Sequence, residues 1–194
     1  MPCAGVIREG KIVLVALLFA AGVSFGDEPP TPVDRQAAIL LKALAYDRNL
    51  ETRSGERVSI AVLYQEGEGT ALEAAELAEA FKIAGKDGIK GLPVTAQALA
   101  FTSIEALLKQ IDTYTLNVFY IHTSLTTALS SVEQVTRSRR IISLGATRRM
   151  VEQGLALGIY SSHGVPRLAL NARAGMVEGL DLDPAIILVA TVIE

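Results

Sequence analysis

The sequence predicts the α/β fold class: a single-domain sandwich with a largely parallel sheet and a C-terminal antiparallel hairpin. Short apolar runs rich in β-branched residues alternate with longer stretches of helical periodicity, which is the pattern of βαβ units. Several runs are apolar at nearly every position, and this indicates strands covered on both faces. Two late runs flank Ser162-His163-Gly164, a turn sequence that predicts the hairpin.

The predicted strands and helices alternate along the chain. Strands are expected at residues 58–64, 93–101, 116–121, 141–144, 155–160 and 167–170. Helices are expected at residues 34–45, 70–83, 103–108, 124–136, 148–153 and 172–177. Asp34, Thr147 and Asn171 stand where an N-cap side chain belongs, and Ser103 opens the helix at 103–108.

The C-terminal segment carries two conflicting signals. Residues 186–193 are β-branched and suit a strand. Asp183-Pro184, however, is an N-cap followed by proline at the first helical position. We predict a helix here.

The first residues predict a cleaved signal peptide over residues 1–26. Arg8 and Lys11 precede an apolar run at residues 12–23, which is shorter than the ~20 residues of a membrane-spanning helix. Small residues in Ser24-Phe25-Gly26 then form a cleavage site. The alternative is an uncleaved membrane anchor. Residues 27–33 follow as an N-terminal extension and residues 34–194 as the α/β domain, which we expect in the periplasm.

Composition excludes several classes of function. The 18 basic and 21 acidic residues leave a net charge of -3, so no basic excess is available to neutralise nucleic-acid phosphates. The one cysteine, Cys3, lies within the predicted signal peptide, so the mature chain has neither a disulfide nor a cysteine-based metal site.

The segment from Gln65 to Thr70 lies between a predicted strand and a predicted helix, as a phosphate-binding glycine loop would. Leu72 replaces the third glycine of the dinucleotide motif, and the lysine of a P-loop is absent. Glu66 and Glu68 would repel phosphate. We interpret the segment as a turn between strand and helix.

No residue pattern predicts catalysis, a metal site or a cofactor. The two histidines, His122 and His163, lie far apart in sequence and form no metal-binding motif. Motifs for a nucleophilic serine are missing, so we expect a protein that is not an enzyme. Asp181 and Asp183 are interpreted as charges at the start of the last helix.

Four residues are weak candidates for contact with a protein partner. A basic cluster is formed by Arg137, Arg139 and Arg140. It either places cations near a helix C-terminus, where they are favourable, or contacts an acidic surface of a partner. His122 follows a predicted strand, and open α/β sheets present ligands at the carboxyl ends of their strands.

Several segments of the chain share a pattern with a known family. They are residues 37–42 and 60–64, Arg140 to Gly145, Gly154 to Ile159, Arg167 to Asn171 and Glu178 to Asp181. In these segments the chain resembles the YfiR/HmsC-like family of periplasmic proteins. It departs from the family at Asp47-Arg48-Asn49-Leu50, where an aromatic-proline step is usual, at Leu168, where phenylalanine is usual, and in lacking the paired cysteines of some members.

The resemblance implies a periplasmic regulator without enzymatic activity. Its partner would be the periplasmic part of an inner-membrane signalling protein, a diguanylate cyclase, and its role the control of cyclic-di-GMP and biofilm formation. The membrane would be reached only through this partner, and a homo-oligomer is possible. A periplasmic small-ligand binding protein that serves a transporter or sensor is the alternative.

Overall fold

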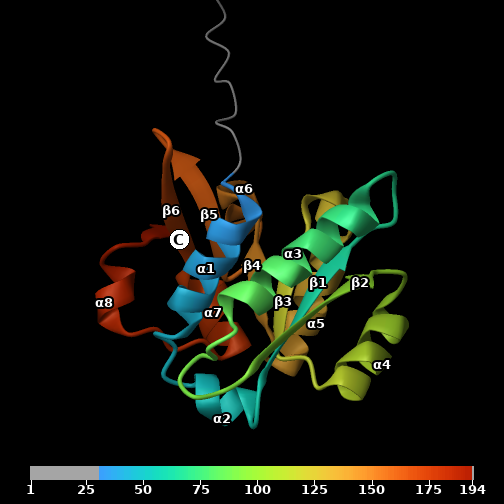
Figure 1. Cartoon of the computed structure of the whole chain (residues 1–194), viewed down its shortest axis with the longest axis horizontal. Helices are drawn as coiled ribbons and strands as arrows, with labels where there is room; N and C mark the ends of the chain where they lie inside the picture. The colour runs from blue at the N-terminus through green and yellow to red at the C-terminus, as the bar shows by residue number, and fades with distance from the viewer. Residues whose placement is uncertain (1–30, 194) are drawn as a thin grey trace, which may run out of the picture.

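A seven-stranded sheet with helices on both faces is the framework of the computed structural model, which describes residues 31–193 (Figure 1). The strands are β1 (Val58–Tyr64), β2 (Val94–Ala100), β3 (Val118–Ile121), β4 (Ile142–Gly145), β5 (Leu157–Ser162), β6 (Val165–Asn171) and β7 (Thr191–Ile193). The helices are α1 (Val33–Leu44), α2 (Leu50–Ser54), α3 (Thr70–Ala84), α4 (Ile104–Tyr114), the 3-10 helix η1 (Thr123–Ala128), α5 (Leu129–Arg139), α6 (Arg148–Glu152), α7 (Ala172–Glu178) and α8 (Pro184–Ile187).

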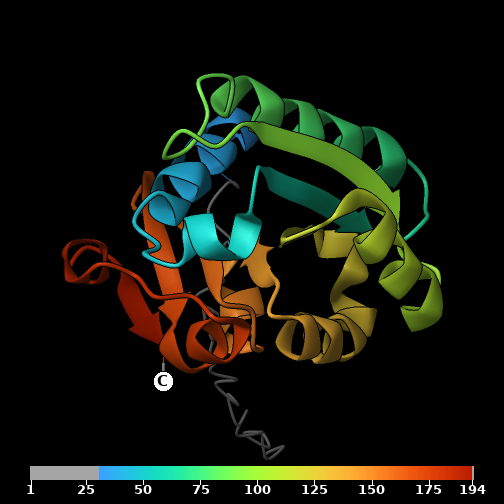
Figure 2. The same ribbon diagram turned by 90° about the horizontal axis from the view of Figure 1, so that it is seen from below.

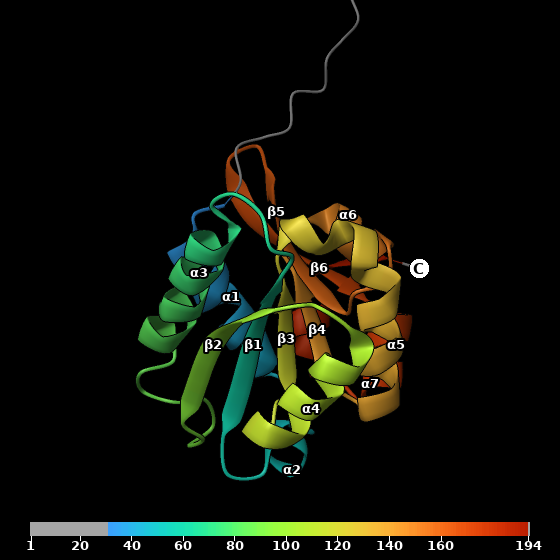
Figure 3. The same cartoon turned by 90° about the vertical axis from the view of Figure 1, so that its right-hand side faces the viewer.

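The strand order is β2-β1-β3-β4-β5-β6-β7. Strands β1 to β5 are parallel, β6 is antiparallel to β5, and β7 is parallel to β6. Helices α1 and α3 cover one face, and α4 to α7 cover the other (Figures 2 and 3). The predicted α/β class, the largely parallel sheet and the hairpin are therefore confirmed.

Each face of the sheet buries its own core because successive side chains of a strand point to opposite faces. Tyr120 packs toward α3, where its ring meets Phe81 edge-to-face at 5.5 Å between ring centroids. The neighbouring Phe119 belongs to the core under α4 and α5. Both faces of β1 and β3 are buried, as their continuous apolar runs predict.

Several local predictions are confirmed at the level of single hydrogen bonds. The side chains of Ser103, Thr147 and Asn171 each accept a hydrogen bond from the backbone N–H three residues later, so each caps its helix. The hairpin turns at His163-Gly164, where both residues have positive φ, as a two-residue type I′ turn requires.

Other local predictions are wrong. Asp34 is not a cap: α1 starts at Val33 with Pro32 at the N-cap position and no side-chain cap. The helix at Ser103 is longer than expected because its apolar face packs under the sheet as far as Ile111, and it ends at Tyr114. The helix predicted at 124–136 begins as the 3-10 helix η1 and continues as α5. Helix α2 was not predicted.

The C-terminal prediction is correct only for the first turn. Asp183 caps Pro184–Ile187 by accepting from Ala185 N–H at 2.9 Å. The chain then turns, and Thr191–Ile193 joins the sheet beside β6, so the hairpin does not finish the sheet. This placement depends on a long-range contact, the 2.7 Å hydrogen bond between the hydroxyls of Tyr160 and Thr191.

Replacing Asn171 with alanine should lower the free energy of unfolding by about 1 kcal/mol, the usual cost of losing an N-cap. Asn171 Oδ1 accepts from Ala174 N–H at 2.9 Å, and its amide donates to the Val151 carbonyl at 3.1 Å. Urea denaturation measures the loss. Asn171→Asp keeps the capping oxygen and should cost less, so equal losses in the two variants would contradict a capping role.

Candidate functional site

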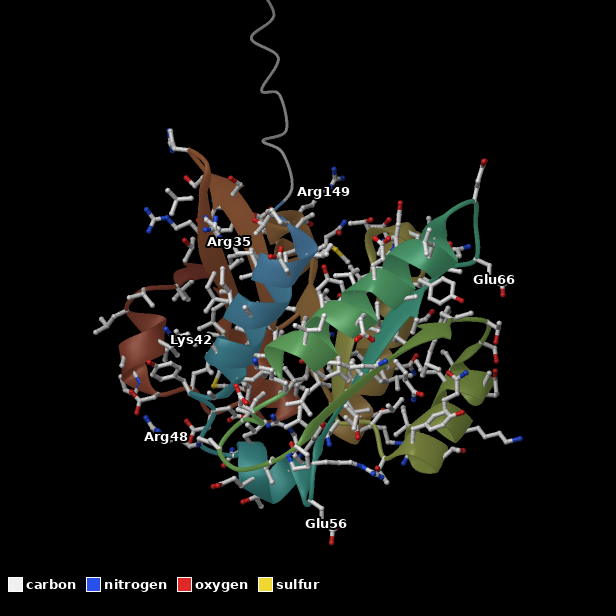
Figure 4. All side chains as sticks on the ribbon, in the orientation of Figure 1. Arg35, Lys42, Arg48, Glu56, Glu66 and Arg149 are labelled. Carbon is white, nitrogen blue, oxygen red and sulfur yellow. The ribbon has the colours of Figure 1, made fainter. Side chains whose placement is uncertain are left out.

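The carboxyl ends of β1 and β3 form the point at which the strand order of the sheet reverses. From β1 the chain crosses to β2 on one side, and from β2 it crosses back to β3 on the other side of β1. Connections therefore lead away from this point in opposite directions, and open α/β sheets bind ligands there. The turn at residues 65–69 follows β1 and projects beyond the sheet, with Glu66 at its outer part (Figure 4).

His122 follows β3 at this edge. Its backbone N–H donates to the Leu63 carbonyl at 2.9 Å, which extends the pairing of β3 with β1 by one residue. The imidazole is 7% exposed. Its Nδ1 accepts from Ser124 N–H at 3.2 Å and lies 2.9 Å from Ser124 Oγ, so His122 is the N-cap of η1.

Four further polar side chains gather near His122 at the same edge. Glu73, from the first turn of α3, places Oε2 3.2 Å from His122 Nε2. Ser124 Oγ accepts from Gln65 N–H at 3.1 Å, and the Gln65 side chain accepts from Thr127 Oγ1 at 3.1 Å. We name Gln65, Glu73, His122, Ser124 and Thr127 the switch-point cluster.

The protonation of the cluster follows from its hydrogen bonds. Burial lowers the pKa of His122, and the nearby Glu73 carboxylate offsets only part of that effect. The imidazole is therefore neutral at pH 7. Because Nδ1 accepts from a backbone N–H, we assign the proton to Nε2, which donates it to Glu73. The Glu73 side chain is 62% exposed, so a negative charge faces solvent at this edge.

Ser124, His122 and Glu73 lie in the order of a catalytic triad, but their hydrogen bonds are those of a cap. The Ser124 hydroxyl oxygen already accepts from Gln65 N–H. His122 Nδ1 is shared between the hydroxyl and the backbone N–H of Ser124. This arrangement positions η1 and presents a carboxylate, and these are properties of a binding site.

The predicted arginines do not join His122. The arginines lie at the C-terminal end of α5, shortly before the amino end of β4, whereas His122 directly follows the carboxyl end of β3. Arg137 Nη2 is 3.1 Å from Glu133, and Arg139 Nη1 is 3.4 Å from Asp112. Arg140 is the C-cap residue of α5 with φ 53. Contact of these four residues with a partner stays a prediction.

Sequence reasoning found one member of the switch-point cluster and missed four. Glu73 lies in the middle of an alanine- and glutamate-rich stretch in which nothing distinguishes it from Glu76 or Glu79. Gln65 and Ser124 follow predicted strands, and this position after a strand was the feature of the sequence that could have identified them as site residues. The sequence alone could not show that β1 and β3 are neighbours.

A separate cavity of about 200 Å³ opens at the amino ends of β1 and β2, beside the end of α4. Part of its polar lining is already partnered within the fold. Ser59 and Thr95 bond each other at 3.3 Å, and Arg57 donates to Thr115 at 3.4 Å. The switch-point cluster, with its exposed carboxylate, is therefore the stronger candidate.

Within residues 31–193, no three histidine, cysteine, aspartate or glutamate side chains gather as metal ligands would. The same stretch contains no helix with the length and apolar character needed to cross a membrane. The predicted signal peptide lies outside the described residues.

The chain is an α/β domain with a mostly parallel sheet, and solved structures share this fold at low sequence identity. No family model and no curated protein matches the sequence. Among solved structures, the ABC domain in complex with L-Trp from Streptococcus pneumoniae matches with a TM-score of 0.56 and 14% identity over 84% of this chain and 60% of that chain. A conserved domain protein of Vibrio cholerae matches at 0.59 and 16% identity, again covering 84% and 60%.

A third solved structure is the ligand-free, open form of CD0873, a substrate binding protein with adhesive properties from Clostridium difficile. It matches with a TM-score of 0.52 and 14% identity over 79% of this chain and 59% of that chain. This chain thus spans about 60% of the length of these proteins. At such identities the likeness establishes the fold.

Proposed function

We propose that this protein is a binding protein of the cell envelope that holds a small ligand at the switch-point cluster and is not an enzyme. The observation that carries the proposal is that polar side chains from the turn after β1, from α3 and from the start of η1 meet at one edge of the sheet. The solved structures with the same fold support it, since one holds L-Trp and another is a substrate binding protein.

The charge of the cluster favours a ligand that carries an ammonium group. Glu73 presents an exposed carboxylate, while the only potential cation of the cluster, His122, is neutral. Glu66 and Glu68 add negative charge on the adjacent turn. A carboxylate is the usual partner of an ammonium group, and a hydrogen bond to a charged group contributes more than a neutral one.

Titration with L-tryptophan tests the proposal: the chain contains no Trp, so with excitation at a wavelength that tyrosine does not absorb, the fluorescence comes from the ligand alone. We expect saturable binding, retained by tryptamine, which keeps the ammonium group, and lost by indole-3-propionate, which lacks it. Glu73→Gln should weaken binding about tenfold or more. Glu76→Gln, on the same helix but outside the cluster, is the control.

Two results would contradict this reading. If calorimetry detects no binding of any standard amino acid or simple amine, the proposed function is wrong. If the purified protein hydrolyses p-nitrophenyl acetate and Ser124→Ala abolishes the reaction, the cluster is catalytic.

A second candidate function is the restraint of a membrane signalling protein, as the resemblance to the YfiR/HmsC-like family implies. Large apolar side chains suited to a protein contact lie exposed in the C-terminal part of this chain: Met176 is 71% exposed and Leu188 is 86% exposed. Deletion of the gene would then raise cyclic-di-GMP and biofilm formation, and the exported protein would restore both. Unchanged cyclic-di-GMP together with ligand binding favours the first candidate.

Both candidates require export from the cytosol, which we propose on the basis of residues 1–26. Mass spectrometry of the native protein should find Asp27 as the first residue. A chain that begins at Met1 and is found in the cytosol would contradict export with cleavage after Gly26.

A further inference from the structure

A pocket lies between α5 and α7, on the face of the sheet that α4 to α7 cover (Figure 3). This pocket has a volume of about 400 Å³ and is lined by Arg137, Asn171, Arg173, Ala174 and Val177. The two helices lie side by side (Figure 3). None of the lining residues belongs to the switch-point cluster, so the proposed function does not account for this pocket.

Arg137 is held in place at the α5 wall of the pocket. Its Nη2 lies 3.1 Å from Glu133 Oε2, one helical turn earlier, and its side chain is 43% exposed. The Glu133 carboxylate is mostly covered, with a side chain 12% exposed. Glu133 therefore orients the guanidinium from one side and leaves the other N–H groups available.

Arg173, on the α7 wall, has no such partner. It is exposed and makes no hydrogen bond or ion pair with any of residues 31–193. The other acidic group near these helices, Glu178, lies buried under α7, where its carboxyl accepts from Ser143 N–H at 2.8 Å. Glu178 also lies close enough to interact with Arg137, but burial raises its pKa to about 7. Below that pH the two guanidinium groups outweigh the partly covered Glu133 carboxylate, and the pocket carries a net positive charge.

The rest of the lining determines the class of ligand. Asn171 is already engaged, because its oxygen caps α7 and its amide binds the Val151 carbonyl. Ala174 and Val177 contribute an apolar part of the lining beside the two arginines. Arginine binds carboxylates and phosphates through paired N–H groups, and two arginines on facing helices suit two negative charges.

We propose that the pocket between α5 and α7 binds a small organic dianion, with its negative charges on Arg137 and Arg173 and a short apolar body against Val177. The site differs from the switch-point cluster in location and in the sign of its charge. It would give the protein a second ligand of a different chemical class.

Isothermal titration with succinate, and separately with inorganic phosphate, tests the proposal on the exported form of the protein. We expect succinate to bind more tightly than phosphate, and binding to weaken with rising salt because the site is charged and partly exposed. Arg173→Gln, at an exposed residue without internal contacts, should fold normally and weaken succinate binding about tenfold. Arg139→Gln removes an equal charge from α5 outside the pocket and should leave binding unchanged.

The proposal is overturned if succinate does not bind, or if Arg173→Gln binds as well as the parent protein. It is also overturned if Arg139→Gln weakens binding as much as Arg173→Gln does, since the effect would then reflect net charge alone. Tighter binding of phosphate would reject an organic ligand.

Discussion

Replacing Asp47 with alanine is expected to lower the free energy of unfolding by about 3–5 kcal/mol, because it leaves a buried positive charge without its partner. Asp47 is fully buried, and its Oδ2 lies 2.6 Å from Arg53 Nη2. Its Oδ1 accepts from the backbone N–H groups of Asn49 and Asp181, both at 3.0 Å.

The large expected cost follows from what Asp47 connects. It joins the start of α2 to the loop before α8, more than a hundred residues later, and its carbonyl also accepts from Lys90 Nζ at 2.9 Å. Arg53 is 11% exposed and cannot regain full hydration when the carboxylate is removed. The segment Asp47-Arg48-Asn49-Leu50 therefore makes several stabilising contacts of its own.

The neighbouring Arg48 provides the matched control. It lies 3.8 Å from Asp181 and 3.9 Å from Asp183, in pairs whose side chains are about half exposed (Figure 4). Such surface pairs contribute about 0–1 kcal/mol, so Arg48→Ala should change little. In the double variant Asp47→Ala/Arg53→Met, the unpaired charge is gone and part of the stability should return. Equal losses for Asp47→Ala and Arg48→Ala by urea denaturation would contradict this account.

The contribution of Glu178 to the free energy of unfolding should fall by about 3 kcal/mol as the pH rises from 4.5 to 7. Burial raises the pKa of Glu178 to about 7, although hydrogen bonds from Thr136 and Ser143 and the charge of Arg137 oppose the rise. The folded protein thus holds a proton that the unfolded chain releases at its ordinary pKa near 4.5. This contribution is fully present below pH 4.5 and is lost as the pH rises through 7.

Glu178→Gln tests the origin of this pH dependence. Glutamine stays neutral and can still accept from Ser143 N–H, the bond that the carboxylate makes at 2.8 Å. The variant should be more stable than the parent protein at pH 8 and nearly equal to it at pH 4.5, as measured by urea denaturation at both values. Glu76→Gln, at an exposed position of α3, should keep the pH profile of the parent protein. A Glu178→Gln variant with an unchanged profile would show that another group is responsible.

Most of the fold could be predicted from local patterns. Apolar runs such as residues 58–64 and 116–121 identify central strands because a strand covered on both faces is apolar at nearly every position. Cap residues such as Thr147 and Asn171 act on N–H groups three positions away, so the chain itself brings the partners together. Strand β7 could not be predicted in this way, because it depends on Tyr160 and on pairing with β6.

By itself, the sequence determined the α/β class and the hairpin, since these follow from periodicity and turn chemistry, and it placed His122 directly after a strand. The tertiary structure decided the strand order, and with it which residues meet His122. Ser124 contacts the imidazole locally, two residues after it, whereas Glu73 reaches it because β1 and β3 pair and bring the start of α3 beside His122. In the same way, Arg137 lines a pocket with Arg173 rather than with its sequence neighbours Arg139 and Arg140. The reason is physical: local patterns arise from contacts within a few residues, whereas a binding site is assembled from side chains that only the packed sheet brings together.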